Sequence, residues 1–258
     1  MKKNHNAVNG RQGELLELLR KKREIPVKTL AEHFGVSLMT IRRDLHELED
    51  KHLVNHQYGK AVLVHRIDPH DPEAEVLICR EKIARYAAQF VEDGDQLFVN
   101  GSSTALKLLE YVNKRKVNVY TNNIRAVDKT YPSGITMNLT GGEIRGHVLV
   151  GDYVMRNLLT LSADKTFLGC AAVYTNGEFR YDIPTEIGIN ESMLARTKKD
   201  VYFLADHTKI HNHTLIDYEK QYGSCTYDCN ITLITDSLAD PECVELLKRT
   251  GMNVIMIS

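Results

Sequence analysis

The sequence lacks a long apolar segment. No run of apolar residues approaches the roughly 20 that a transmembrane helix needs, so we expect no membrane contact. The first ten residues are polar and basic, and no apolar stretch follows them as it would in a signal peptide. These two absences predict a cytoplasmic protein.

Cysteine is scarce and odd in number. Five cysteines in 258 residues leave one unpaired, and a chain of this length rarely relies on a disulfide framework. Cys225 and Cys229 are separated by three residues, but no second Cys/His pair follows at zinc-site spacing. We therefore expect free, mostly buried thiols, no metal and no cofactor. Of the loop histidines, His211 and His213 are expected to face solvent and His207 to border a ligand pocket.

Net charge is also nearly absent, at −1, but the charges are unevenly distributed. Residues 1–65 hold 12 lysines and arginines against 8 acidic residues, whereas the remainder holds 21 against 26. The basic N-terminal segment and the acidic remainder indicate that only the N-terminal segment binds a polyanion. Hydrophobic residues make up 43% of the chain, which is ample for one or two packed domains.

Three helical patterns occupy the first fifty residues. Residues 11–22 interleave leucines with charges, Pro26 opens a second helix that Gly35 ends, and Ser37 caps a third. The third helix has an apolar face that can pack on the first two and an opposite face that is polar and basic. This arrangement is typical of a helix-turn-helix, whose third helix enters the major groove.

Residues 53–64 follow as two short strands around Tyr58-Gly59-Lys60, a pattern that predicts a wing reaching phosphates or the minor groove. Residues 1–65 are therefore predicted to form a winged helix-turn-helix that binds double-stranded operator DNA. The alternative, a structural helical domain with a solvated face, leaves the arginine pair unexplained. The expected DNA contacts lie on the exposed face of the third helix and at the wing tip: Ser37, Met39, Thr40, Arg42, Arg43, His46, Tyr58 and Lys60.

Residues 66–73 are polar with two prolines and predict an extended linker, which we place over residues 66–80. From residue 81 a helix and then short apolar strands alternate with helical patterns, which predicts an α/β domain with a largely parallel sheet and helices on both faces. The strand candidates are residues 96–99, 117–121, 135–139, 166–168, 201–205, 231–235 and 254–257.

Polar loops follow several of these strands, where α/β sheets bind their ligands. A glycine followed by serines and a threonine at a helix start can hold an anion through hydroxyl and N–H groups. Each motif alone also fits a helix cap, a turn or a surface pair. The candidates for effector binding are Asn100, Gly101, Ser102, Ser103, Thr104, Asn122, Gly142, Glu143, Arg145, Asp206 and Lys209.

The recognition helix, Val36-Ser37-x-x-Thr40-Ile41-Arg42-Arg43-Asp44-Leu45-x-x-Leu48, resembles the signature of the DeoR/GlpR family of bacterial sugar-metabolism regulators. Similar motifs follow in the family's order, among them Arg80-Glu81-Lys82-Ile83-Ala84, Asp164-Lys165-x-Phe167-Leu168-Gly169 and Ala205-Asp206-His207-Thr208-Lys209. The resemblance implies a ribose-5-phosphate-isomerase-like α/β effector domain, here residues 81–258, that senses a phosphorylated sugar.

The chain departs from the family pattern at three places. Gly59-Lys60 stands where two glycines are usual at the wing tip. Asn100 replaces an aspartate, and Asn190 replaces a frequent lysine four residues after Glu186. The last two departures leave open a different or uncharged sugar ligand.

These patterns predict a transcription regulator, a repressor of a carbohydrate-utilisation operon, acting as a homodimer or homotetramer whose operator binding responds to a sugar or sugar phosphate. It is not expected to be an enzyme. The alternative is a sugar-phosphate isomerase or transferase with an accessory DNA-binding head. For that reading Glu143, Glu186, Asp206 and Lys209 offer acid–base groups.

Overall fold

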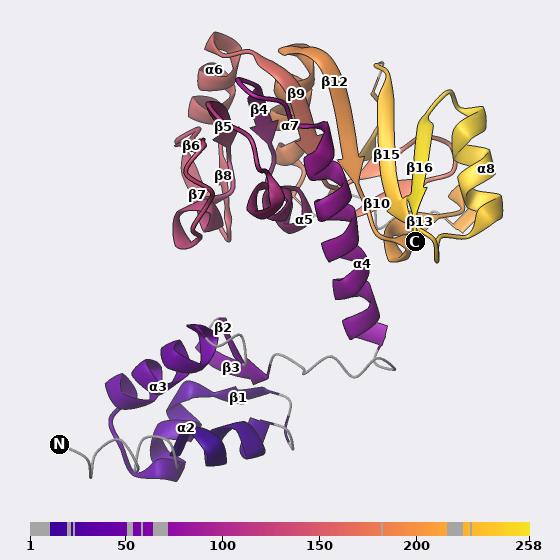
Figure 1. Cartoon of the computed structure of the whole chain (residues 1–258). Coiled ribbons are helices and arrows are strands. Elements are labelled where there is room, and N and C mark those ends of the chain that lie inside the picture. The colour runs from indigo at the N-terminus through magenta and orange to yellow at the C-terminus, as the bar shows by residue number, and fades with distance from the viewer. Residues whose placement is uncertain are drawn as a thin grey trace. The chain divides into compact units, whose positions relative to one another are not determined.

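The computed structural model divides into two units, residues 1–75 and 76–258 (Figure 1). It describes residues 11–19, 22, 24–50, 54–57, 59–63, 72–181, 183–215, 224–227 and 229–258. Each unit has a hydrophobic core of its own. Within these described ranges, no helix has the length and apolar character needed to cross a membrane.

The first unit is the predicted winged helix-turn-helix. Helical residues 11–19 precede β1 (Glu24–Pro26), α2 (Val27–Phe34), α3 (Leu38–Asp50), β2 (Val54–Gln57) and β3 (Lys60–Leu63). The strands form an antiparallel sheet in the order β1-β3-β2. β1 was not predicted, because Pro26 was read as the helix start. The backbone of Pro26 is extended, at φ −58° and ψ 137°, and α2 begins one residue later, at Val27.

Local signals at the helix ends explain these bounds. Gly35 ends α2 in the left-handed conformation, at φ 61°, which glycine adopts without a Cβ clash. The Ser37 hydroxyl accepts the N–H of Thr40 at 3.2 Å and so caps α3. Ile41, Leu45 and Leu48 are all buried, which confirms the predicted core face of the third helix.

The helix α4 (Pro72–Ala87) corrects the predicted linker over residues 66–80. Residues 66–71 lie outside the described ranges, but from Pro72 onward the chain is helical. Proline fits the first turn of a helix because the N–H it lacks has no partner there. Cys79 and Ile83 are buried, and the helix begins nine residues before its predicted start at residue 81.

A seven-stranded sheet forms the core of the second unit, and every neighbouring pair of its strands is parallel. All seven predicted strands are confirmed, two of them starting three or four residues earlier than expected. In spatial order they are β16 (Asn253–Ile257), β15 (Ile231–Asp236), β12 (Thr197–Leu204), β9 (Ala163–Leu168), β4 (Gln96–Val99), β5 (Val117–Thr121) and β6 (Ile135–Leu139).

Helices cover both faces of this sheet, as its alternating apolar side chains require (Figure 1). Phe98, Phe203 and Leu233 point to one face, where they pack with α6 (Asp152–Thr160), α7 (Thr185–Ala195) and α8 (Pro241–Arg249). Their neighbours along the strands, such as Val99 and Leu204, point to the other face and pack with α4 and α5 (Ser103–Lys107).

The strand order reverses at β4. The chain leaves β4 outward through β5 and β6, then returns to place β9 on the other side of β4. In open parallel sheets such a reversal opens a crevice beyond the carboxyl ends of the two strands, and ligands bind there. The order of the strands therefore places a ligand site after β4 and β9.

Short strands outside the main sheet were not predicted. β10 (Ala172–Tyr174), β11 (Phe179–Arg180), β13 (Ile210–His211) and β14 (Ser224–Cys225) form a second sheet in the order β13-β10-β11-β14. β7 (Glu143–Arg145) and β8 (Val148–Val150) form a hairpin. Strands of two or three residues are too short to show an alternating pattern.

A buried ion pair joins β9 to the start of β4. Lys165 is almost fully buried, and its Nζ lies 2.9 Å from Asp95 Oδ2 and 2.7 Å from Glu92 Oε2. Burial lowers the pKa of Lys165, but the two carboxylates outweigh that effect and raise it. Lys165 and its neighbour Asp164, which accepts the N–H of Gln96 at 2.9 Å, thus fix two central strands.

We predict that Lys165→Met lowers the free energy of unfolding of the second unit by about 3–5 kcal/mol, because it leaves the buried Asp95 carboxylate without its cation. The pair of exposed Lys199 with partly buried Asp164, at 3.6 Å, gives the control: Lys199→Met should cost less than about 1 kcal/mol. Urea unfolding followed by near-ultraviolet circular dichroism measures this unit, since every tyrosine except Tyr58 follows residue 76. Equal unfolding midpoints for the two variants would contradict the prediction.

Candidate functional site

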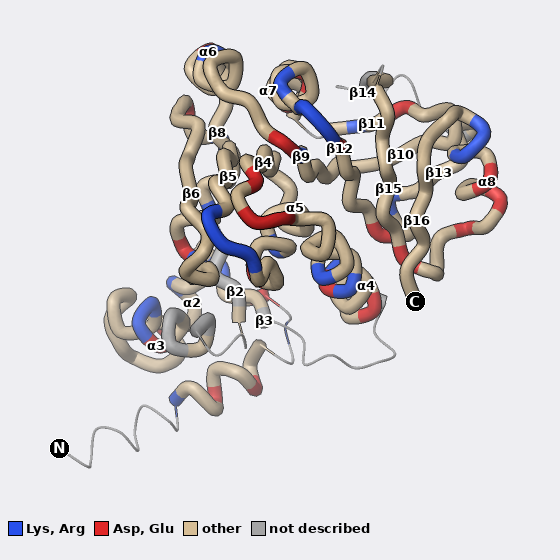
Figure 2. Tube along the Cα trace, turned by 45° about the horizontal axis from the view of Figure 1, so that its top comes forward, with Lys and Arg blue, Asp and Glu red and all other residues tan. Residues whose placement is uncertain are grey.

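The outer face of α3 has the composition of a DNA-reading surface. Arg42 and Arg43 are exposed, and Met39 has 72% of its surface accessible. Blue segments mark the basic residues of α3 in Figure 2. Thr40 is half-buried, with its hydroxyl 2.9 Å from that of Ser37. Of the other predicted contacts, Tyr58 and the side chain of His46 lie outside what the structure describes.

Asp44 holds this face in place from behind. Its carboxylate is buried and bonded by two guanidinium nitrogens of Arg11, with Nη2 at 3.0 Å from Oδ1. A two-pronged bond of this kind fixes both distance and orientation. The aspartate that follows the arginine pair therefore anchors α3 to the first helix, while the arginines point outward.

The wing-tip lysine is already engaged. Lys60 Nζ lies 2.6 Å from Glu24 Oε1 across the β1–β3 pair, and both side chains are about half exposed. Gly59, just before it, turns the chain at φ 76°. A phosphate contact by Lys60 must compete with Glu24 for the same charge.

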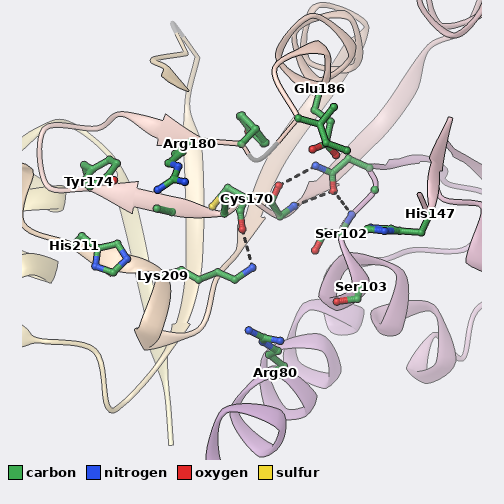
Figure 3. A pocket seen from close by; sticks show the side chains of 17 residues that line it. Arg80, Ser102, Ser103, His147, Cys170, Tyr174, Arg180, Glu186, Lys209 and His211 are labelled. Carbon is green, nitrogen blue, oxygen red and sulfur yellow. Dashed lines mark hydrogen bonds between the residues drawn. The ribbon is translucent and has the colours of Figure 1, made fainter. Parts of the chain in front are cut away.

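In the second unit, a cavity of about 480 Å³ lies beyond the carboxyl ends of β4 and β9, at the strand-order reversal (Figure 3). Ser102, Ser103 and His147 lie on one side, Arg180, Tyr174 and His211 on the other, and Arg80 and Lys209 between them. The lining residues come from α4, the loops after β4, β9 and β12, the β7–β8 hairpin, the second sheet and α7. They are Arg80, Asn100, Gly101, Ser102, Ser103, His147, Gly169, Cys170, Ala171, Ala172, Tyr174, Arg180, Tyr181, Ile183, Glu186, Lys209 and His211.

The side chain of Asn100 shapes the loop that follows β4. Its Oδ1 accepts the N–H groups of Ser102 at 3.1 Å and Gly169 at 3.0 Å, and its Nδ2 donates to the Gly169 carbonyl at 2.9 Å. Ser102 in turn caps α5 by accepting the N–H of Ala105. These bonds leave the exposed Ser103 hydroxyl at the cavity wall.

Two glycines allow this loop to approach its neighbours closely. A Cβ on Gly101 would lie 2.3 Å from Val148 Cγ1, and one on Gly169 would lie 2.1 Å from Ser102 Oγ. Both separations are far below van der Waals contact. Gly169 therefore allows the loop after β9 to lie directly against the serine that caps α5.

Asn100 and Asn190, the two positions at which this unit departs from the family pattern, contact each other. Asn100 Nδ2 donates to Asn190 Oδ1 at 3.2 Å, and both side chains are buried. Two neutral amides stand where the family pattern has a carboxylate and an ammonium, so the two changes cancel in charge. Asn190 does not line the cavity, and together the departures alter the support of the loop without changing the net charge beneath it.

Cationic side chains dominate the polar lining. Arg80 bonds Asp206 Oδ2 through Nε at 2.7 Å, and Lys209 Nζ donates to the Cys170 carbonyl at 2.7 Å. Burial raises the pKa of Asp206, but hydrogen bonds from Thr208 and Arg80 outweigh it and lower the pKa. Asp206 is therefore an ionised anchor that holds Arg80 in position.

The two histidines of the cavity are held neutral. Burial lowers the pKa of His147, and Arg125 adds to the effect. Burial and then Arg180 lower the pKa of His211 in the same way. At neutral pH both imidazoles can donate or accept hydrogen bonds without carrying a charge.

Five of the eleven predicted effector residues line the cavity: Asn100, Gly101, Ser102, Ser103 and Lys209. The prediction that the polar loops after the strands bind the effector needs correction for the other six. Glu143 and Arg145 pair with each other on the exposed β7–β8 hairpin. Those that do not line the cavity are Thr104, Asn122, Gly142, Glu143, Arg145 and Asp206.

Sequence patterns missed the second wall of the cavity. This wall belongs to or adjoins the second sheet, which the sequence patterns did not reveal. Its residues include Cys170, Tyr174, Arg180 and His211. Arg80 was assigned to a linker. The signal available for Arg80 was its place in the Arg80-Glu81-Lys82-Ile83-Ala84 motif, next to the buried Ile83 and Ala84.

Comparison with known families matches both units. Residues 11–66 match the DeoR-like helix-turn-helix domain, and residues 79–237 match the DeoR C terminal sensor domain. The sensor match alone covers more than half of the chain.

Similar proteins agree over most of their length. An HTH-type transcriptional regulator of Bacillus subtilis (strain 168), YulB, is 28% identical over 97% of each chain. The glycerol-3-phosphate regulon repressor of Escherichia coli (strain K12) is also 28% identical, over 80% of this chain and 84% of the repressor. A solved D-ribose-5-phosphate isomerase aligns with 52% of this chain and 54% of its own at 13% identity, with a TM-score of 0.38, too low to carry an argument. The α3 surface, the sensor cavity and the two domain matches together show that the chain belongs to the DeoR family of DNA-binding transcriptional regulators.

Proposed function

We propose that the chain represses a carbohydrate-utilisation operon and releases or gains its operator when a sugar phosphate binds in the cavity after β4 and β9. The observation that supports this most is the charge of the cavity. Its lining holds three cationic side chains, Arg80, Arg180 and Lys209, and one carboxylate, Glu186. Asp206 lies outside the lining but bonds Arg80 at 2.7 Å, so the excess is one positive charge. An anionic ligand compensates that excess.

The cavity also suits the rest of a sugar phosphate. Its volume of about 480 Å³ lies within the range of about 300–1,000 Å³ that small-molecule sites occupy. Ser103, Tyr174 and the neutral His147 offer hydroxyl and imidazole groups for the sugar hydroxyls. We place the phosphate between Lys209, Arg80 and the Ser102-Ser103 turn.

The positions of the acid–base groups favour a regulator over an enzyme. Of the four that an isomerase would use, Glu186 and Lys209 line the cavity. Glu143 is exposed on the hairpin and Asp206 is held by Arg80. A glycerol-3-phosphate regulon repressor among the relatives also supports a phosphorylated effector.

Regulation then follows from linkage. The effector changes operator affinity only by its difference in affinity for the DNA-binding and non-binding states. We propose a homodimer or homotetramer, since helix-turn-helix proteins commonly pair so that two recognition helices meet half-sites about one DNA turn apart.

For the DNA face, we predict that Arg42→Ala and Arg43→Ala weaken operator binding. Loss of a bidentate base contact costs about 1–3 kcal/mol, which is roughly a 5- to 150-fold loss of affinity. Arg249→Ala, at an exposed arginine of α8, serves as the control with the same charge change. Fluorescence anisotropy at fixed salt measures the affinity. If neither α3 variant binds more weakly than Arg249→Ala, α3 does not read the operator.

For the wing, we predict that Glu24→Gln strengthens DNA binding, because it releases Lys60 for a phosphate. Affinity should increase for all sequences alike, and the salt dependence should steepen by about one phosphate contact. Lys60→Ala should do the reverse. The measurement is the slope of log affinity against log salt, and an unchanged slope in both variants would show that Lys60 does not touch DNA.

For the cavity, we predict that Ser103→Glu abolishes the response to sugar phosphate while leaving operator affinity intact. The new carboxylate would occupy and repel the phosphate position. Ser133→Glu, at an exposed serine before β6, is the matched control. Thermal shift against a sugar-phosphate panel, followed by operator release, gives the readout. A full response in Ser103→Glu would place the effector elsewhere.

A further inference from the structure

A cluster of three potential metal ligands lies outside the effector cavity. Cys79, His207 and Asp236 each place one ligand atom within 4.8 Å of the other two. They come from α4, from the turn after β12 and from the last position of β15. Cys79 and Asp236 are buried, whereas the His207 side chain is 20% exposed. None of the three lines the cavity.

We propose that Cys79, His207 and Asp236 bind one Zn²⁺ ion. Thiolate, imidazole and carboxylate are the ligand types that zinc takes in proteins, and the sulfur disfavours Mg²⁺ and Ca²⁺. Three protein ligands leave the fourth tetrahedral position for water. The partial exposure of His207 gives both the ion and that water a route to the site.

The local hydrogen bonds hold two of the ligands ready for a cation. Asp236 Oδ1 lies 2.9 Å from His207 Nδ1 and accepts the N–H of Leu238 at 3.0 Å. Asp236 Oδ2 accepts the N–H of His207 at 2.8 Å. Such outer bonds orient metal ligands. Two N or O ligands on tetrahedral zinc lie about 3.4 Å apart, given bonds of about 2.0–2.1 Å. The pair therefore needs to open by only about half an ångström.

A bound ion would restrain α4, the helix that contributes Arg80 to the effector cavity. Cys79 precedes Arg80, which lines the cavity, and His207 follows Asp206, which bonds Arg80 at 2.7 Å. A zinc ion between Cys79 and His207 would be a second link between α4 and the turn after β12, next to the Arg80–Asp206 pair. Zinc would thereby hold Arg80 in the position that the cavity uses.

The proposal is tested with the metal alone, on the full chain. Metal-free protein is titrated with Co²⁺, which reports a thiolate ligand by a near-ultraviolet charge-transfer band, and then with Zn²⁺ in competition with a chromogenic chelator. We expect one ion per chain, the thiolate band, and a raised Tm with Zn²⁺. Cys79→Ser should remove the band and weaken Zn²⁺ binding by more than the about 10–100-fold that loss of an outer-shell partner costs.

Two other cysteine variants give the controls. Cys229→Ser removes an exposed thiol and Cys243→Ser a buried one on α8, and both should bind Co²⁺ as the wild type does. Asp236→Asn also loses backbone hydrogen bonds, so Cys79→Ser is the decisive variant. The proposal is overturned if Cys79→Ser keeps the thiolate band, if Cys229→Ser loses it, or if the wild type binds neither ion.

Discussion

The side chain of Asn100 ties together the ends of β4 and β9, where the strand order reverses. It is buried and bonds Ser102, Gly169 and Asn190. A buried polar group that loses its partner costs about 1–3 kcal/mol, so the loop has little freedom to rearrange. The serines on one side of the cavity and the Gly169-Cys170 segment on the other are both positioned by this one amide.

Sequence patterns predicted the frame of this site and missed half of its wall, for physical reasons. The seven main strands are apolar runs between polar loops, and parallel strands bring such loops to one edge. That reasoning located Ser102, Ser103 and Lys209. It failed for Arg180 and His211, because their strands are two residues long and are held by pairing with distant segments. It misplaced Glu143 and Arg145, because a hairpin between β6 and α6 carries them out of the cavity.

Charge is arranged differently in the two units. In the winged helix, buried Asp44 fixes α3 from within, exposed Glu24 bonds Lys60, and Arg42 and Arg43 are exposed on the outer face of α3. In the sensor unit, buried Asp206 holds Arg80 while the cavity keeps an excess of cations. In both units a carboxylate holds a cationic side chain in position, Glu24 for Lys60 and Asp206 for Arg80. Effector and operator can influence each other only by favouring different states of the chain.

The central claim is that an anionic sugar and operator DNA are coupled through this chain, and coupling in binding must be reciprocal. The most direct test measures effector affinity by isothermal titration calorimetry twice, without DNA and with saturating operator selected from random duplexes. Operator affinity is measured in parallel with and without the effector. The account predicts that both affinities change by the same factor, of about 5- to 150-fold for a typical coupling. An effector affinity that is unchanged by bound operator would contradict it.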